Sequence, residues 1–167
     1  DYLTTGAIRH AVNMTPLDAK TLSEMRGFLD VGYRLGLLLG QFETGSIKRC
    51  TLQFRGEVAG KTTKLITASF AAGLLANALE EEINIVNDEV LLRERGIELV
   101  EQRRGDMGAF SAVVLAEVET ERETHKAAAT VFGTDMLRLV QLEDFRLDAY
   151  LDGVLMVFTH HDVPGRA

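Results

Sequence analysis

Two places in the chain combine residue types that could carry out chemistry. His160, His161 and Asp162 stand in succession near the end of the sequence, and imidazole and carboxylate groups are common metal ligands. The run that starts at Val154 predicts a strand, and adjacent residues of a strand point to opposite faces, so both histidines cannot easily bind one ion. Cys50 falls on the apolar side of an alternating segment, which favours a buried small hydrophobe over a nucleophile. We therefore expect no metal site and no nucleophilic catalysis.

Motifs that hold nucleotides or form hydrolase active sites are missing from the sequence. It contains no Gly-x-Gly-x-x-Gly after a strand, no Gly-x-x-x-x-Gly-Lys loop and no Gly-x-Ser-x-Gly elbow. We therefore expect no catalytic residue and no bound cofactor in this chain.

Composition indicates an ordinary globular protein. The 167 residues are 46% hydrophobic, which is enough for one domain with a core, or one domain with fragments of its neighbours. The net charge is −7 and no basic run exceeds a pair, which speaks against nucleic-acid binding. The single cysteine excludes a disulfide within the chain, and no apolar stretch is long enough to span a bilayer. Since the first residues also lack a signal-peptide pattern, we expect a cytoplasmic protein without a membrane partner.

The two ends of the sequence suggest that it is part of a longer chain. It starts at Asp1 without a methionine and stops at Ala167, directly after the strand-like run. A domain rarely stops where nothing remains to cover such a strand, so we expect flanking segments.

The first half of the sequence is mainly helical in pattern. Pro16 and Asp18 are typical of a helix start, and apolar residues then recur at helical spacing over 21–42. Gly27 and Gly32 suggest a bend or break between two helices within that range. A further helix is expected from about Lys64 to Glu80, in which small residues at 68 and 71–73 would allow close packing against a sheet.

The second half is rich in strand patterns. A short extended piece at 84–87 and a helix capped by Asp88 and ending at Gly96 come first. Strands are expected at 47–55, 97–103, 110–119, 125–132, 137–142, 145–152 and 154–159. A charged turn at 119–123 would join two of them into a hairpin. Helices early and strands late predict an α+β domain with an antiparallel or mixed β-sheet.

Short segments in a fixed order along the chain match one enzyme family. They are Gly6-Ala7-Ile8-Arg9-His10-Ala11-Val12-Asn13, Arg34-Leu35-Gly36-Leu37-Leu38-Leu39-Gly40-Gln41, Arg55-Gly56-Glu57-Val58-Ala59, Ile83-Asn84-Ile85-Val86-Asn87, Arg93-Glu94-Arg95-Gly96-Ile97, Thr130-Val131-Phe132-Gly133 and Phe145-Arg146-Leu147-Asp148-Ala149. In number, order and spacing they resemble the intervening domain of long-type D-3-phosphoglycerate dehydrogenase, which lies between the catalytic half and the ACT domain. The resemblance runs from about residue 6 to residue 165.

The resemblance implies a domain layout and a role. Residues 1–15 would be the exit linker from the catalytic half, 16–152 the intervening regulatory domain with helices on one face of its sheet, and 153–167 the start of a truncated ACT domain. The parent enzyme would oxidise 3-phosphoglycerate with NAD in the first step of L-serine biosynthesis. The family's NAD fingerprint and catalytic residues lie upstream, so this segment would regulate and assemble a homo-oligomeric parent without turnover of its own.

The resemblance also implies an anion or effector site on the last strands. Arg138 matches a position where the family places a Lys or Arg, and Arg146 lies on the polar face of the next strand. Tyr150, on that same face, stands where some members carry an anion-binding Arg. A small anionic metabolite is therefore the expected ligand, because anion binding needs several cationic donors that converge.

A second ligand site is implied at the start of the ACT domain. The segment from Thr159 resembles the first strand and loop of serine-sensing ACT domains, and His160 and Asp162 match the positions that hold the effector's carboxylate and amine. Gly165 would let backbone N–H groups approach a ligand carboxylate. The remaining residues of such a site would come from later ACT residues and a partner subunit.

Three alternatives stay open from the sequence. The same domain type occurs in iron–sulfur L-serine dehydratases, although the Ala-Val-Asn linker at 11–13 favours the dehydrogenase. The segment could be a pure dimerising spacer without a ligand. It could also be catalytic, which would require NADH production from phosphoglycerate.

Overall fold

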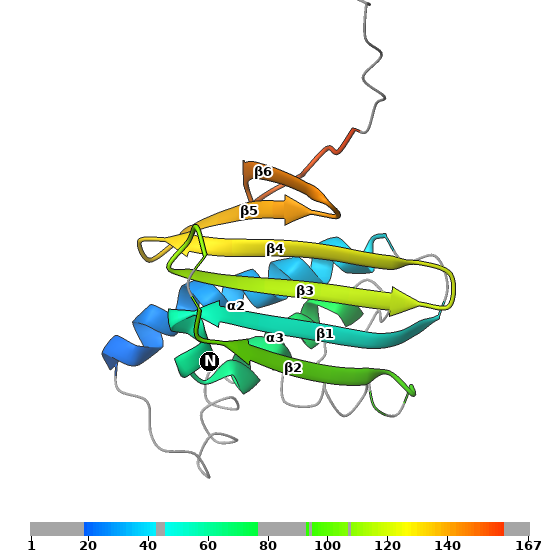
Figure 1. The fold of residues 1–167 in the computed structure, drawn as a ribbon, viewed down its shortest axis with the longest axis horizontal. Helices are drawn as coiled ribbons and strands as arrows, with labels where there is room; N and C mark the ends of the chain where they lie inside the picture. Colours follow the sequence, from blue (N-terminus) through cyan, green and yellow to red (C-terminus); the bar gives the residue numbers. More distant parts are fainter. Residues whose placement is uncertain (1–18, 43–45, 77–92, 94, 107, 159–167) are drawn as a thin grey trace, which may run out of the picture.

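The described part of the chain folds into one β-sheet with two α-helices on one of its faces (Figure 1). The computed structural model describes residues 19–42, 46–76, 93, 95–106 and 108–158. In chain order the elements are α2 (Ala19–Gly40), β1 (Ile47–Gly56), the 3-10 helix η2 (Glu57–Gly60), α3 (Thr63–Leu75), β2 (Glu98–Arg104), β3 (Ala112–Thr120), β4 (Thr124–Phe132), β5 (Met136–Leu142) and β6 (Phe145–Tyr150). The predicted α+β class and the helices on one face are both confirmed.

The sheet is mixed, and its order is β2-β1-β3-β4-β5-β6. β1 and β2 run parallel, joined by the part of the chain that contains α3, whereas every other neighbouring pair is antiparallel. The turn between β3 and β4 is closed by Thr120, whose backbone N–H donates to the carbonyl of Glu123. The hairpin expected around 119–123 is therefore confirmed.

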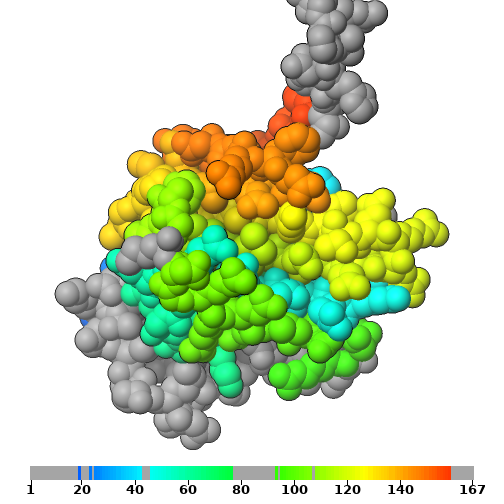
Figure 2. All heavy atoms as spheres, viewed as in Figure 1, coloured from blue at the N-terminus to red at the C-terminus, as the bar shows by residue number. Residues whose placement is uncertain are grey.

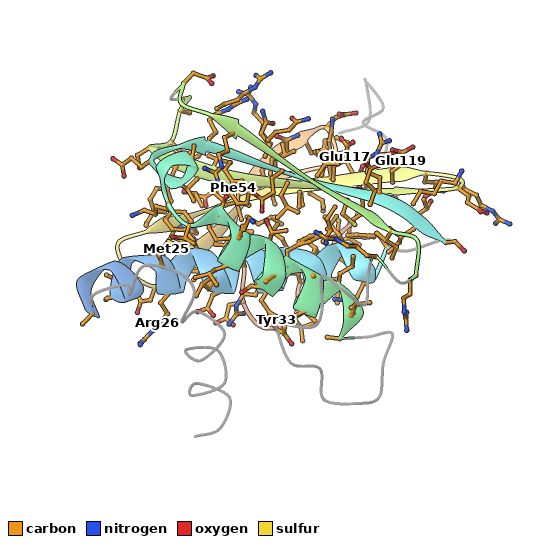
Figure 3. All side chains as sticks on the ribbon, turned by 90° about the horizontal axis from the view of Figure 1, so that it is seen from below. Met25, Arg26, Tyr33, Phe54, Glu117 and Glu119 are labelled. Carbon is orange, nitrogen blue, oxygen red and sulfur yellow. The ribbon has the colours of Figure 1, made fainter. Side chains whose placement is uncertain are left out.

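Alternation along the strands separates a covered face from an open one. Cys50, Leu52 and Phe54 of β1 are fully buried against the helices, and alternate residues of β3 are buried in the same way. Figure 3 shows Met25 and Phe54 between the two layers, while Glu117 and Glu119 point away on the far side of the sheet. We call that far side, which no helix of the described residues covers, the open face.

The long helix α2 is continuous, so the predicted break between two helices at Gly27 and Gly32 is wrong. Its glycines instead permit close approach of neighbouring backbone. A Cβ atom at Gly32 would lie 2.6 Å from the carbonyl oxygen of Ile66, and one at Gly36 would collide with that of Phe70 in α3. Packing at these contacts offsets the weak helix propensity of glycine.

Close packing in α3 also has a different partner from the one predicted. A Cβ atom at Gly73 would collide with the carbonyl oxygen of Tyr33, so this small residue faces α2 and not the sheet. The described helix ends at Leu75, and residues 77–80 of the predicted helix lie outside the described part.

The strand predicted from Val154 to Thr159 is wrong for residues 154–158. After β6 the chain turns at Gly153, which has a φ of 63°, and leads away from the sheet (Figure 1). Arg34 of α2 holds the two residues that follow β6. Its guanidinium donates to the Leu151 carbonyl at 3.2 Å and to the Asp152 carboxylate at 2.8 Å.

Several predicted features lie outside the described residues. They are the linker at 1–15, the helix start at Pro16 and Asp18, the extended piece at 84–87, the cap at Asp88 and the ACT start from Thr159. In the part of the chain that is described, no helix is long and apolar enough to cross a membrane.

Candidate anion-binding site on the open face of the sheet

The open face contains a hollow of about 340 Å³. Residues from β1, β3, β4, β5 and β6 surround it, together with the segment that precedes β3. Its lining residues are Gln53, Arg55, Gly108, Ala109, Phe110, Val113, Leu115, Ala128, Val140, Gln141 and Arg146. Figure 2 shows this face, where the segment before β3 (light green) lies against β6 (orange).

The segment at 108–111, which precedes β3 and lines the hollow, is attached to the end of β1. We call this segment the cover. Gly56 has a φ of 78°, and a Cβ atom there would collide with the carbonyl oxygen of Ser111. That oxygen accepts a hydrogen bond of 2.9 Å from the backbone N–H of Glu57. The Arg55-Gly56-Glu57 sequence therefore fixes the segment at 108–111 beside the Arg55 side chain, because only glycine readily adopts this conformation.

Two further contacts hold the same segment. The Phe110 and Phe132 rings lie with centroids 6.0 Å apart, which is within the range of favourable aromatic pairs. The buried hydroxyl of Thr130 donates to the carbonyl oxygen of Ala112, the first residue of β3, and so holds the point where this segment enters the strand. Contacts within the protein therefore hold the cover in place beside the hollow.

A β-bulge forms the side of the hollow near β5. Ala129 pairs with Leu139 and Ala128 with Gln141, so Val140 is an extra residue in β5. A bulge changes the direction of the side chains next to it, and consecutive residues Val140 and Gln141 both line the hollow. Gln141 pairs with Arg146, which places the Arg146 guanidinium at the β6 side.

Of the three anion-site residues predicted from the sequence, the structure brings Arg138 and Tyr150 together but places Arg146 apart from them. Arg146 lines the hollow, whereas Arg138 and Tyr150 face each other in the β5–β6 pair at its other end. The Arg138 guanidinium carbon lies 4.1 Å from the centroid of the Tyr150 ring. Its buried Nε lies 3.2 Å from Asp148 Oδ1 and forms no hydrogen bond, so this ion pair is an electrostatic contact only.

Other charges on the sheet form pairs. Arg49 Nε donates to Glu98 across β1 and β2 at 2.9 Å, and this hydrogen bond raises the pKa of the guanidinium. Lys126 Nζ lies 3.0 Å from Asp144, whose carboxylate raises the pKa of the ammonium group. These exposed pairs contribute little stability. Among the described residues they do not include Arg55 or Arg146, the two arginines that line the hollow.

The remaining predicted residues have simpler outcomes. Cys50 is fully buried, and this burial raises the pKa of its thiol to about 12, which confirms a buried hydrophobe. His160, Asp162 and Gly165 lie outside the described residues, so the serine site stays a prediction. Within the described ranges, no three His, Cys, Asp or Glu side chains gather as metal ligands.

Sequence reasoning missed Arg55, Gln53 and Gln141 as site residues. The alternation in β1 did place Gln53 and Arg55 on a polar face, and this was the available signal. What the pattern could not supply was the strand order, which brings β1 and β6 to opposite sides of one hollow.

Comparison with known proteins identifies the family. The sequence model described as the D-3-phosphoglycerate dehydrogenase intervening domain matches residues 24–143, which include most of α2, all of α3 and most of the sheet. This chain belongs to that family. The match also includes Arg55 and Arg138 and ends shortly before Arg146.

Relatives of the intervening-domain family extend the similarity to most of the chain. A D-3-phosphoglycerate dehydrogenase from Synechocystis is 28% identical over 94% of this chain, and that of Archaeoglobus fulgidus is 25% identical over 95%. The Bacillus subtilis enzyme is 23% identical over 95% of the chain. The chain spans about three tenths of the length of these relatives, since it covers 28% of the first and 30% of the other two.

Proposed function

We propose that this chain is a regulatory and assembly domain of a D-3-phosphoglycerate dehydrogenase and takes no part in hydride transfer. The observation that carries the proposal is the similarity, over nearly the whole chain, to proteins of that name. The parent would oxidise 3-phospho-D-glycerate to 3-phosphohydroxypyruvate with NAD, as the first step of L-serine biosynthesis in the cytoplasm. The names of these relatives favour the dehydrogenase over an iron–sulfur L-serine dehydratase.

Among the described residues, the turn that follows β1 does not fit a nicotinamide dinucleotide. Such a cofactor needs a glycine-rich turn between a strand and a helix, so that its pyrophosphate meets the helix N-terminus. β1 is followed instead by the four-residue η2, whose first turn contains the acidic Glu57. This supports binding of NAD by another part of the parent.

Regulation by a small anionic metabolite is supported by the open face. A hollow of about 340 Å³ with two arginines and two glutamines on its lining has the size and the donors of a small-molecule site. The downstream ACT residues His160, Asp162 and Gly165 would add a serine site in the complete enzyme. Both effectors would act on a catalytic half that is linked upstream of this domain.

Assembly into a homo-oligomer, or docking of the ACT domain, is supported by the edge strand β6. The backbone of β6 has a partner on one side only, since β6 ends the described sheet. Its apolar side chains are also uncovered, with Phe145 65% and Leu147 36% exposed. An edge strand with exposed apolar side chains is suited to pairing with another chain or domain.

Two experiments on the parent and the isolated chain test this function. NADH production from 3-phosphoglycerate and NAD is measured for the 167-residue chain, for the parent and for a parent that lacks residues 19–158. We expect turnover by the parent, none by the chain, and a deletion variant that no longer responds to added anions. Turnover by the isolated chain would sink the non-catalytic role, and an unchanged anion response after deletion would sink the regulatory one.

Light scattering tests the assembly role and separates it from a ligand-free spacer. We expect the parent to form a defined oligomer and the double variant Phe145→Ser/Leu147→Ser to shift it toward smaller species or loosen the ACT domain. The matched control is Tyr33→Ser, an exposed aromatic on α2, away from the β6 edge. An oligomer that changes with Tyr33→Ser but not with the β6 variant would contradict assembly through this edge.

A further inference from the structure

We propose that the hollow on the open face binds a compact organic dianion whose two acidic groups are held by Arg55 and Arg146. The inference rests on the proposed function, because it assigns the anion response of that function to a site and a ligand class. It places the site away from Arg138 and Tyr150, to which the resemblance pointed.

Charge is the first argument for an anion in the hollow. Its lining contains two guanidinium groups and no carboxylate, although the whole chain has a net charge of −7. Within the described residues, neither Arg55 nor Arg146 forms an ion pair or a side-chain hydrogen bond, whereas other arginines of the structure do have partners, namely Arg34, Arg49, Arg103 and Arg138. The exposed Arg104 stands opposite Arg55 in the β1–β2 pair and adds to the positive potential at this corner. Unpaired guanidinium groups are suited to bidentate binding of carboxylate or phosphate.

The placement of the two arginines is the argument for two acidic groups. Arg55 comes from β1 and Arg146 from β6, and three strands lie between these in the sheet. With strand spacings of about 4.8 Å, roughly 19 Å of sheet separates the two backbones. The two side chains therefore approach the hollow from opposite sides, and one ligand that meets both must present an acidic group at each end.

The floor of the hollow is the argument for an organic ligand. Val113, Leu115, Ala128 and Val140 line it with apolar atoms between the two arginines. Phe110 covers it from the segment before β3. An inorganic anion would leave these apolar side chains in contact with water. A short carbon skeleton between two acidic groups would remove them from water, and burial of apolar surface is common in small-molecule sites. A dicarboxylate and a phosphorylated hydroxy acid share this chemistry.

The glutamines supply neutral polar contacts on the same lining. Gln141 donates its Nε2 to the Glu143 carbonyl at 2.9 Å, which holds its side chain in place beside Arg146. Gln53 lies next to Arg55 on the same face of β1. Because bonds within the protein already hold the cover, β1 and β5, a ligand would meet a preformed site and lose little affinity to ordering.

Calorimetry with four probes tests the ligand class. The 167-residue chain is titrated with succinate and 3-phosphoglycerate, which have two acidic groups on a short skeleton, and with acetate and inorganic phosphate, which do not. Since the chain contains no tryptophan, Phe110→Trp adds a local fluorescence reporter at the cover. We expect at least one of the first two probes to bind about tenfold or more tightly than both controls and to change the fluorescence of this introduced indole, because two charge-assisted contacts replace one. Succinate distinguishes a dicarboxylate source from a phosphorylated one.

Charge-removing variants test the site. Arg55→Gln and Arg146→Gln should each weaken binding of the better probe about tenfold or more, while Arg138→Gln should leave it within about twofold, with folding of each variant checked by thermal unfolding. Binding that is lost in Arg138→Gln but kept in both hollow variants would overturn the site and leave the anion response of the proposed function standing. No binding by any probe, or equal binding of inorganic phosphate, would overturn the dianion inference. The assay of the parent and its deletion variant tests the proposed function separately.

Discussion

Arg138 and Tyr150 stack directly across the β5–β6 pair, with 4.1 Å between the guanidinium carbon and the ring centroid. Asp148, two residues before Tyr150 on the same side of β6, provides a carboxylate 3.2 Å from Arg138 Nε. The Arg138 charge is thus already engaged by two groups of the neighbouring strand. The same strand leaves Arg146 without such partners among the described residues, so the two arginines differ in what they can offer a ligand.

Loss of the stacking contact should cost a small, measurable amount of stability. Tyr150→Leu removes the ring, and we expect the free energy of unfolding to fall by about 0.5–1 kcal/mol, the range for cation–π contacts at exposed sites. Tyr150→Phe keeps a ring over Arg138 and should remain within a few tenths of wild type. Urea unfolding followed by circular dichroism provides the comparison, and equal losses in both variants would show that the ring contributes nothing.

Close packing of α2 on α3 predicts a large effect of one added methyl group. A Cβ atom at Gly36 would collide with the Phe70 carbonyl oxygen and lie 2.6 Å from the Leu74 nitrogen. Backbone atoms cannot move aside as a side-chain end can, so Gly36→Ala should lower the free energy of unfolding by about 1–3 kcal/mol. Gly60→Ala is the control, because no atom lies within 4 Å of its Cβ position, and we expect a change below about 0.5 kcal/mol. Equal values for the two variants would contradict tight packing at Gly36.

The same glycines explain an error of sequence-based reasoning. Gly32 weakens a helix by propensity and so predicts a break, but propensity takes no account of the partner that requires a small residue. Here the partner is the backbone of α3 at Ile66. The strands were predicted more accurately than the helices. Apolar and polar residues alternate along a strand such as β1 because one face of the sheet is buried and the other is not.

The site was less predictable than the fold for a geometrical reason. Gln53 and Arg55 were on a predicted polar face and Arg146 on another, yet the pairing of strands decides which polar faces adjoin. β2 pairs with β1 in parallel at the edge of the sheet, β1 pairs with β3 on its other side, and a bulge at Val140 alters the side-chain directions of β5. The error at 154–158 has a similar cause, since the turn at Gly153 and the Arg34 contacts that remove this segment from the sheet depend on tertiary structure.

Cys50 should be unreactive in the native state. The thiolate is the reactive form, and burial raises the pKa of this thiol to about 12. Between about pH 6 and 10 we therefore expect no labelling of folded protein by a disulfide reagent, and one thiol per chain once denaturant is added. Native labelling that rises with pH around 8 would contradict the burial of Cys50.

Asp152 should make stability depend on pH at the acidic end. Its carboxylate accepts hydrogen bonds from Arg34 and from the backbone N–H of Gly153, and these lower its pKa from the usual value of 3.8. A lowered pKa in the folded state adds stability that is complete above the unfolded pKa and is lost as pH falls through the folded pKa. Asp152→Asn should thus be less stable than wild type at pH 6, and this difference should shrink below about pH 4. Thermal unfolding from pH 3 to 7 measures it, with the exposed Asp135→Asn as control; a difference that is constant with pH would contradict the shift.

The attachment of the hollow's cover to β1 leads to a prediction that links the fold to binding. Gly56 adopts a φ of 78° and a ψ of −143°, a conformation that side chains rarely adopt, and it admits the Ser111 carbonyl oxygen at close range. Gly56→Ala should therefore lower the free energy of unfolding by about 1–3 kcal/mol and displace the segment at 108–111. Displacement would move Phe110 away from Arg55, so anion binding should weaken even though no charge is removed.

Gly105→Ala provides the matched control for this effect. It lies just after β2, and no atom is within 4 Å of its Cβ position, so stability and anion binding should both stay close to wild type. Calorimetry with succinate and 3-phosphoglycerate, performed well below the melting temperature of each variant, separates loss of binding from loss of folding. If folded Gly56→Ala bound these anions as tightly as wild type, the cover would have no part in the site, and the hollow would have to hold its ligand through the strands alone.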